Sequence, residues 1–335
     1  MQQTSLNVDI RPYRPEDEAA VLDLLRASLG PGPTGDRSVG FFRWKHIENP
    51  FGPSHMLVAV VDDRIVGLRA FMPWRFRAPT CNISAVRAVD TATHPEFQGL
   101  GIFTRLTRTA VEELRGKVDL VFNTPNERSG SGYLKMGWQL VGKMPVRIRV
   151  RRPIRFARGL PYVKSEPSAV RRLPDVDAAP IADLLVDTDA IDRLLKEAPR
   201  EPARLRTELS LEYLRWRYAS APFDYRAVRL DLRGTLKGLG VFRVRRRGRL
   251  LESTVTEIIA PGDDKNEHRL LREVVRAADT DYVVYRSRSG RHAGWRESLQ
   301  APGGISLMVN RLRSVSPDPV NPRSWALSLG DLEVF

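Results

Sequence analysis

An internal repeat is the feature that most restricts the fold of this 335-residue chain. The ten residues Phe42–Phe51 match Leu214–Phe223 at a constant offset of 172 positions, with Arg, Trp, Pro and Phe identical. With one deletion, the match continues from Asp63–Gly67 to Gly234–Gly238. Self-similarity over a long period is typical of a chain that contains more than one copy of one folding unit. Chance similarity is the alternative.

The repeat and the length together set the expected domain organisation. A chain of this length exceeds one ordinary domain, so two domains are expected. We expect residues 1–150 to form the first domain and residues 181–335 to form a second copy of the same fold. Residues 151–180 contain several prolines and are expected to form a connector.

Hydrophobic periodicity in the first half predicts strands and helices that alternate along the chain. Val21, Leu22, Leu24 and Leu25 have the spacing of a helix that begins after Pro15. The expected order is β-α-α-β-β-β-α-β-α-β, with strands at 7–14, 55–61, 65–71, 81–93, 119–123 and 139–149. This order predicts an α/β fold, with a mixed central sheet flanked by helices, present twice in tandem.

Composition and charge exclude several classes of protein. With 42% hydrophobic and 28% charged residues and no apolar run of about 18–20 residues, the sequence predicts a globular protein without a membrane span. The polar N-terminus and the single cysteine, Cys81, favour a cytoplasmic location. The net charge of +14 is spread over both halves, and its densest run, Arg147–Arg158, is expected to be a solvated strand and connector. Nucleic acid is therefore an unlikely partner, and the oligomeric state cannot be read from the sequence.

The stretch from His94 to Phe103 is the segment most informative about chemistry. It follows a predicted strand and opens a predicted helix, with Gly99 and Gly101 at the turn. Glycines let the backbone bend sharply and approach a ligand closely. The free amides at a helix N-terminus, together with the helix dipole, favour an anion such as a pyrophosphate. The stretch is neither a P-loop nor a complete Gly-x-Gly-x-x-Gly motif.

Two motifs in this half resemble those of the GNAT superfamily of acetyl-CoA-dependent N-acyltransferases. Residues 98–103 (Gln-Gly-Leu-Gly-Ile-Phe) fill the pattern Gln/Arg-x-x-Gly-x-Gly/Ala, and only Phe103 departs from it, at a position for a small residue. Residues 126–138 resemble Asn-x-x-Ala-x-x-Leu-Tyr-x-Lys-x-Gly-Phe, with Ser129 and Gly132 in place of Ala and Leu. The resemblance covers residues 8–150 and implies a GNAT-like fold that binds acetyl-CoA as acyl donor.

The resemblance also implies which residues bind the cofactor. The backbone of the last strand residues would bind the pantetheine arm, and the amides of the loop that follows would bind the pyrophosphate. Asn126 would contact the cofactor from the second motif. The complete expected set is Thr91, Ala92, Thr93, Gln98, Gly99, Leu100, Gly101, Ile102, Phe103 and Asn126.

Acyl transfer to an amine needs a proton donor for the sulfur and a proton acceptor for the nitrogen. The resemblance assigns the donor to Tyr133, because a thiolate with a pKa of about 8.5 leaves more easily when it is protonated. A tyrosine packed in the core is the alternative for Tyr133. Asp90 is the first candidate for the acceptor, and a structural carboxylate is the alternative for it. His94 and Glu96 are weaker candidates.

The remaining sequence features narrow the hypothesis. His46, His55, His268 and His292 have no metal-ligand spacing, so no metal is expected. The second copy has aspartates and a glutamate where the first has its glycine loop, and like charges repel a pyrophosphate. We therefore expect only the first copy to bind acyl-CoA and to transfer the acyl group directly to a primary amine. The alternatives are a basic nucleic-acid-binding or regulatory module and a CoA-binding pseudoenzyme.

Overall fold

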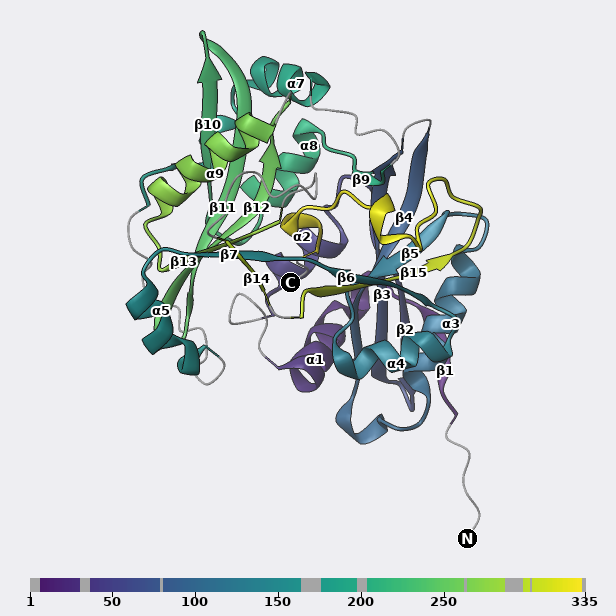
Figure 1. Ribbon diagram of the computed structural model, residues 1–335. Coiled ribbons are helices and arrows are strands. Elements are labelled where there is room, and N and C mark those ends of the chain that lie inside the picture. The colour runs from purple at the N-terminus through teal and green to yellow at the C-terminus, as the bar shows by residue number, and fades with distance from the viewer. Residues whose placement is uncertain are drawn as a thin grey trace. The chain divides into compact units, whose positions relative to one another are not determined.

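The computed structural model describes residues 7–30, 37–78, 81–163, 176–197, 204–261, 264–286, 298–301 and 303–332. The chain forms two compact units, and each is described by itself (Figure 1). The first unit comprises residues 1–142 together with 306–322, and the second comprises residues 143–305 together with 323–334.

The first unit is a mixed sheet with helices, as the sequence predicts. Its strands run in the order β1-β2-β3-β4-β5-β15-β6; β4 and β5 are parallel, and β1–β4 pair antiparallel. The elements are β1 (Asp9–Pro12), α1 (Glu18–Leu29), α2 (Val39–His46), β2 (His55–Val61), β3 (Arg64–Arg77), β4 (Asn82–Thr93), α3 (Ile102–Leu114), β5 (Leu120–Asn123), α4 (Glu127–Lys135), β6 (Gln139–Met144) and β15 (Ile305–Arg311).

Local sequence explains most of these elements. The four apolar positions predicted for α1, from Val21 to Leu25, are all buried. Asp62 and Asp63 join β2 to β3 with φ angles of 45° and 62°, which is the left-handed backbone of a two-residue hairpin turn. The predicted loop at 30–35 lies outside the described residues except for Gly30.

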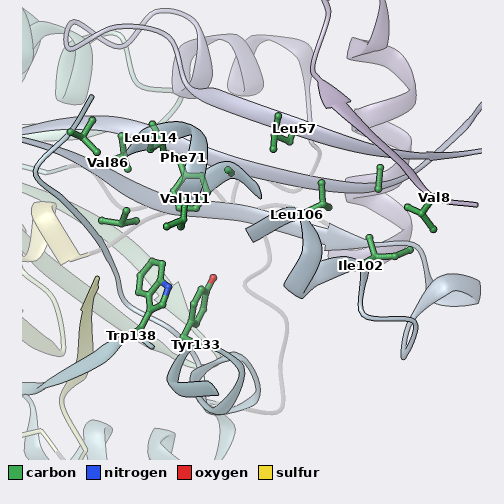
Figure 2. Packing of buried hydrophobic residues seen from close by; sticks show 14 of the residues in the cluster. Val8, Leu57, Phe71, Val86, Ile102, Leu106, Val111, Leu114, Tyr133 and Trp138 are labelled. Carbon is green, nitrogen blue, oxygen red and sulfur yellow. The ribbon is translucent and has the colours of Figure 1, made fainter. Parts of the chain in front are cut away.

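The core of the first unit lies between the sheet and α3 (Figure 2). Ile102 and Leu106 of α3 pack against Leu57 and Val66 of the strands, and Tyr133 and Trp138 extend the same cluster. A Cβ atom added to Gly67 of β3 would lie 2.8 Å from Ile102 Cγ2. The glycine therefore lets α3 approach the sheet closely.

The second unit is also a mixed sheet with helices. Its sheet runs β14-β7-β13-β12-β11-β10-β8, with β12 and β13 parallel. The elements are β7 (Arg147–Val150), α5 (Pro153–Gly159), β8 (Ala179–Pro180), α6 (Ile181–Leu184), α7 (Thr188–Glu197), β9 (Arg206–Thr207), α8 (Leu211–Leu214) with a π-helical turn (Arg215–Ala219), β10 (Tyr225–Leu232), β11 (Thr235–Arg247), β12 (Leu250–Ile259), α9 (Asp264–Ala278), β13 (Tyr282–Tyr285), β14 (Leu299–Gln300) and α10 (Leu329–Leu332).

The packing of matched residues supports the internal repeat. Trp44 and Trp216, at the matched positions, are both buried. Gly238 matches Gly67, and a Cβ atom there would lie 2.7 Å from Leu270 Cδ1 of α9. In each unit a glycine therefore lets a helix approach a strand closely: α3 approaches β3 in the first unit, and α9 approaches β11 in the second.

Two features of the chain differ from the expected boundaries. The single strand expected at 139–149 is split near Pro145 into β6, in the first sheet, and β7, in the second. The first sheet also contains a strand from the second half of the sequence, β15, which lies between β5 and β6 (Figure 1). The expected connector also begins with a helix, α5, while its residues 164–175 lie outside the described part of the chain.

Candidate active site

The predicted phosphate loop has the backbone shape that its glycines suggest. Gly99 and Gly101 have φ angles of 82° and 74°, and no atom lies within 4 Å of a Cβ placed on either. Gly101 is the N-cap of α3, and Leu100 between them is 53% exposed. The loop therefore opens to solvent at the N-terminus of a thirteen-residue helix.

The amides of this loop are not used by the protein itself. No side chain caps α3, and no hydrogen bond in the described part of the chain uses an amide of residues 99–103. Gln98 turns back instead, and its Nε2 donates to the carbonyl of Thr93 at 3.3 Å. Unpaired amides with the positive end of a helix dipole form a site for an anion.

The strand before the loop has a free edge. Thr91, Ala92 and Thr93 pair with Arg69, Leu68 and Gly67 of β3. On its other side, β4 pairs with β5 only from Ala85 to Arg87. Among the described strands, none therefore pairs with the far edge of residues 91–93, where the resemblance expects the pantetheine arm. Backbone groups at such an edge hydrogen-bond an extended ligand as they would a strand.

Asn126 has a local role that the sequence analysis missed. It is the N-cap of α4, and its Oδ1 accepts hydrogen bonds from Ser129 N at 2.9 Å and Ser129 Oγ at 3.0 Å. An Asn at the predicted start of a helix is typical of an N-cap residue, and this pattern could have predicted the local role of Asn126. A contact of Asn126 with the cofactor stays a prediction.

Tyr133 is packed in the core and is also hydrogen-bonded to a cation. Its ring lies 5.5 Å from that of Phe103 and 4.7 Å from that of Trp138, and its side chain is almost fully buried. Its Oη accepts a hydrogen bond from Arg69 Nη1 at 2.8 Å. The same Nη1 donates to Thr91 Oγ1. Arg69 therefore contacts two of the predicted site residues and is a candidate that the sequence did not reveal.

Asp90 occupies a β-bulge between β3 and β4. Arg69 pairs with Thr91 and Ala70 with Val89, so Asp90 is the extra residue and has a φ angle of 37°. Its Oδ2 lies 2.8 Å from both Lys45 Nζ and His46 Nε2, and both partners are buried. Burial alone would raise the pKa of Asp90, but the charge of Lys45 and the hydrogen bond with His46 outweigh burial and hold this pKa well below its usual value. A carboxylate stabilised in this way is a weaker base.

His46 links Asp90 to a serine. Its Nδ1 lies 2.9 Å from Ser54 Oγ, and Ser54 is partly exposed. Burial lowers the pKa of His46 despite the hydrogen bond to Asp90, so the ring is neutral at pH 7. A neutral ring that donates a hydrogen bond from Nε2 to Asp90 accepts a hydrogen bond from the Ser54 hydroxyl at Nδ1. No pattern in the sequence predicted this arrangement, because Asp90 lies 44 residues after His46 in the chain.

The weaker candidates lie elsewhere in the first unit. His94 and Glu96 sit in the turn before the loop, where Arg64 Nη2 donates to His94 Nε2 at 2.7 Å and Arg64 Nη1 to Glu96 at 3.0 Å. His55 pairs with Glu113 at 3.0 Å. Neither pair involves Asp90. Within the described residues, no three His, Cys, Asp or Glu side chains gather as metal ligands.

Two carboxylates line a small cavity in the second unit. Glu257, near the end of β12, is buried, and a narrow cavity of about 20 Å³ is lined by Glu257, Glu267, Arg286 and Ser328 with neighbouring strand residues. The loop residues Gly262 and Asp263 lie outside the described part of the chain. A space of this size holds one water molecule at most.

Other surface features do not coincide with the predicted site. A cavity of about 650 Å³ lies between the C-terminal half of α3, the segment around Trp138 and Asn310 of β15. None of the predicted cofactor or catalytic residues lines it. In the run Arg147–Arg158, Arg147 bonds Ser298, and Arg152 pairs with Asp279. The described part of the chain contains no helix with the length and apolar character needed to cross a membrane.

Comparisons with known proteins agree with the fold and the two motifs. Residues 9–141 match the family model for the acetyltransferase (GNAT) domain. No curated protein sequence matches the chain.

Three solved structures share the fold over most of this chain. A probable N-acyltransferase from Enterococcus faecalis V583 is 12% identical with a TM-score of 0.65, covering 91% of this chain and 72% of that one. A GCN5-related N-acetyltransferase from Anabaena variabilis is 10% identical with a TM-score of 0.64, covering 92% and 73%. Eis1 from Mycobacterium abscessus is 13% identical with a TM-score of 0.57, covering 91% and 74%. Residues 9–141 thus match the acetyltransferase (GNAT) domain, and the chain shares its fold with these solved structures.

Proposed function

We propose that this protein transfers an acetyl or other acyl group from acyl-CoA to a primary amine by direct attack in a ternary complex. The observation that supports this most is the row of unused amides from Gly99 to Phe103 at the start of α3. The free edge of β4 at Thr91–Thr93 supports the same cofactor, because it gives an extended pantetheine arm a row of backbone groups. When bound, acyl-CoA supplies the activated thioester.

In this proposal the side chains of the site move two protons. The amine nitrogen bonds to the thioester carbon, and the carbon–sulfur bond breaks with its electron pair on sulfur. Tyr133 gives its hydroxyl proton to that sulfur. The proton lost by the nitrogen passes to Ser54 Oγ while Ser54 passes its own proton to His46 Nδ1, and the charge of Asp90 stabilises the imidazolium. Asp90 thus acts through its charge, with His46 as the proton acceptor.

The second unit is proposed to be a degenerate copy that does not bind acyl-CoA. The buried Glu257 and the small cavity beside it support this proposal, since a diphosphate needs more space than a cavity that holds one water molecule at most. The amine acceptor is best sought among small amines, amino sugars, aminoglycosides and protein lysines.

Substitution of the loop glycine tests the cofactor site. Acetyl-CoA at about a hundred times its Kd is expected to stabilise the wild-type protein by about 2.7 kcal/mol, read as a rise in melting temperature. Gly101→Glu places a carboxylate among the amides, and we expect it to abolish both this rise and CoA release with any amine.

Gly116→Glu is the matched control for this experiment. Gly116 has a φ angle of 76°, against 74° at Gly101, and open space around its Cβ position, but it follows the C-terminal end of α3. The control variant therefore introduces the same backbone strain and the same charge. We expect acetyl-CoA still to raise its melting temperature. If Gly101→Glu still bound acetyl-CoA, the proposed site would be wrong. If the wild-type protein binds acetyl-CoA but no class of amine causes it to release CoA, the protein is a pseudoenzyme.

A further inference from the structure

Arg69 lies at the centre of the candidate active site but is fully buried. Its guanidinium is stacked 4.4 Å from the ring centre of Phe71 and 5.5 Å from that of Tyr133. Its Nη1 bonds both the Tyr133 hydroxyl and Thr91 Oγ1. Figure 2 shows the Tyr133 hydroxyl directed toward the strand that carries Phe71, with Trp138 beside the ring. One guanidinium therefore joins the predicted proton donor to the strand predicted to bind pantetheine.

The fold gains little from this arginine. Among the described residues, Arg69 has no ion pair, and its Nε and Nη2 have no hydrogen-bond acceptor. A buried cation without a direct carboxylate partner is unfavourable for stability.

The second unit shows that the fold does not require an arginine at this position. Gly238 matches Gly67, so Gly240 stands two residues later, where the first unit has Arg69. A Cβ atom on Gly240 would lie 3.2 Å from Val228 and 3.3 Å from Val274, so a side chain there would require both valines to shift. By contrast, Lys45 and His46 are matched by Arg217 and Tyr218, which are also buried. The arginine is therefore specific to the unit with the phosphate loop.

We propose that Arg69 is the positioning residue for Tyr133 as the acid that protonates the departing sulfur, an inference that rests on the proposed function. An arginine only donates hydrogen bonds, so Tyr133 Oη is the acceptor in this bond and its proton is directed away from Arg69. When the carbon–sulfur bond breaks, the proton leaves Oη for the sulfur, and the resulting phenolate lies next to the guanidinium. A proton from solvent later restores the phenol.

Binding of free CoA at different pH values tests this inference without requiring an amine. Desulfo-CoA, which has hydrogen in place of the thiol, serves as the reference. A hydrogen bond from Tyr133 stabilises a thiolate, so the affinity of the wild-type protein for CoA relative to desulfo-CoA is expected to rise about tenfold between about pH 7 and about pH 9.5. Arg69, which is itself influenced by the charge of Asp90, is the charged side chain that bonds Tyr133, while Phe103 and Trp138, which pack against the Tyr133 ring, are uncharged.

The variants separate positioning from structure. Arg69→Met is expected to lose this pH-dependent preference while it keeps or raises the melting temperature and binds desulfo-CoA as before. Arg69→Lys should recover part of the preference, and Tyr133→Phe should lose all of it. Arg87→Met is the matched control, because Arg87 is also buried and stacked on aromatic rings, but it bonds Thr124 rather than Tyr133. This control should keep the preference.

The outcomes distinguish this inference from the proposed function. If neither CoA nor desulfo-CoA binds the wild-type protein, the proposed cofactor site fails. If both bind but the preference is absent from the wild-type protein, or persists in Arg69→Met or Tyr133→Phe, the role of Arg69 is overturned and the cofactor site stands. Should Arg69→Met not fold, Arg69→Lys and Tyr133→Phe decide the question.

Discussion

Asp90 shows how one bulged residue organises several side chains. The bulge turns its carboxylate to Lys45 and His46, and through His46 to Ser54. Removing one partner of a buried ion pair costs about 3–5 kcal/mol, because the other charge is left uncompensated. The stability of the site and its proposed proton transfer therefore depend on the same carboxylate.

Substitutions at Asp90 and Ser54 should separate these two effects. Asp90→Asn is expected to lower the free energy of unfolding by about 3 kcal/mol and also to reduce kcat. Ser54→Ala removes only the partly exposed hydroxyl at the start of the proposed proton relay from Ser54 to His46. We expect kcat to fall about 100-fold, while the free energy of unfolding changes by less than about 1 kcal/mol. Urea unfolding and steady-state kinetics measure both quantities. A Ser54→Ala enzyme with wild-type kcat would remove the relay from the mechanism.

The buried ion pair of Asp90 also predicts how the stability of the protein depends on pH. Because the pKa of Asp90 is lower in the folded protein than its ordinary value of 3.8, its contribution is fully present above about pH 4. It is lost as the pH falls through the folded-state pKa. Below pH 4, the wild-type protein should therefore lose stability more steeply than Asp90→Asn.

At the scale of elements, two departures from the family motifs compensate each other. Phe103 of α3 is large where the pattern has a small residue, and Gly132 of α4 replaces a leucine. A Cβ atom on Gly132 would lie 3.0 Å from Phe103 Cε1. The phenyl ring therefore occupies space on α4 that a leucine side chain would fill, and it also contacts Tyr133 edge-on.

A double-mutant cycle tests this compensation. Phe103→Ala alone should destabilise the protein by about 2 kcal/mol through lost packing, and Gly132→Leu alone should also destabilise it through overpacking. The double variant should recover at least about 1 kcal/mol relative to the sum of the two single changes. Additive free energies of unfolding would show that the two positions are independent.

At the scale of the whole molecule, most of the second unit is inserted in the chain sequence between two strands that are neighbours in the first sheet. β6 ends at Met144 and β15 begins at Ile305, yet the two strands are adjacent. A Cβ atom on Gly304 would lie 2.7 Å from the Met144 carbonyl oxygen, so the two ends of the insertion are close together. In the second sheet, β7 lies between β13 and β14.

This topology predicts which fragments fold. Residues 1–150 alone lack β15, so β6 has no neighbour and β5 has a free edge; we expect this fragment to show no cooperative unfolding by circular dichroism. Replacing residues 145–303 with a short glycine-rich linker and ending the chain at Pro322 should give a first unit that unfolds cooperatively. Cooperative unfolding of residues 1–150 by themselves would show that β15 is dispensable.

The sequence by itself determined the elements and the motifs whose causes are local. The apolar spacing from Val21 to Leu25 produced α1, and the two glycines of residues 99–101 produced the open loop, because turns and amphipathic helices depend on residues close in the chain. The repeat around Trp44 and Trp216 predicted two copies of one fold, and the chain does form two units, each with its own sheet.

Only the tertiary structure decided which distant residues meet. Arg69 with Tyr133, and Ser54 with His46 and Asp90, are brought together by strand register and by a bulge, which no local pattern encodes. The sequence also did not predict that β7 joins the second sheet and β15 the first. The periodicity of a sequence identifies a strand but not the strand with which it pairs. Pairing is settled by backbone hydrogen bonds and side-chain burial over long sequence separations.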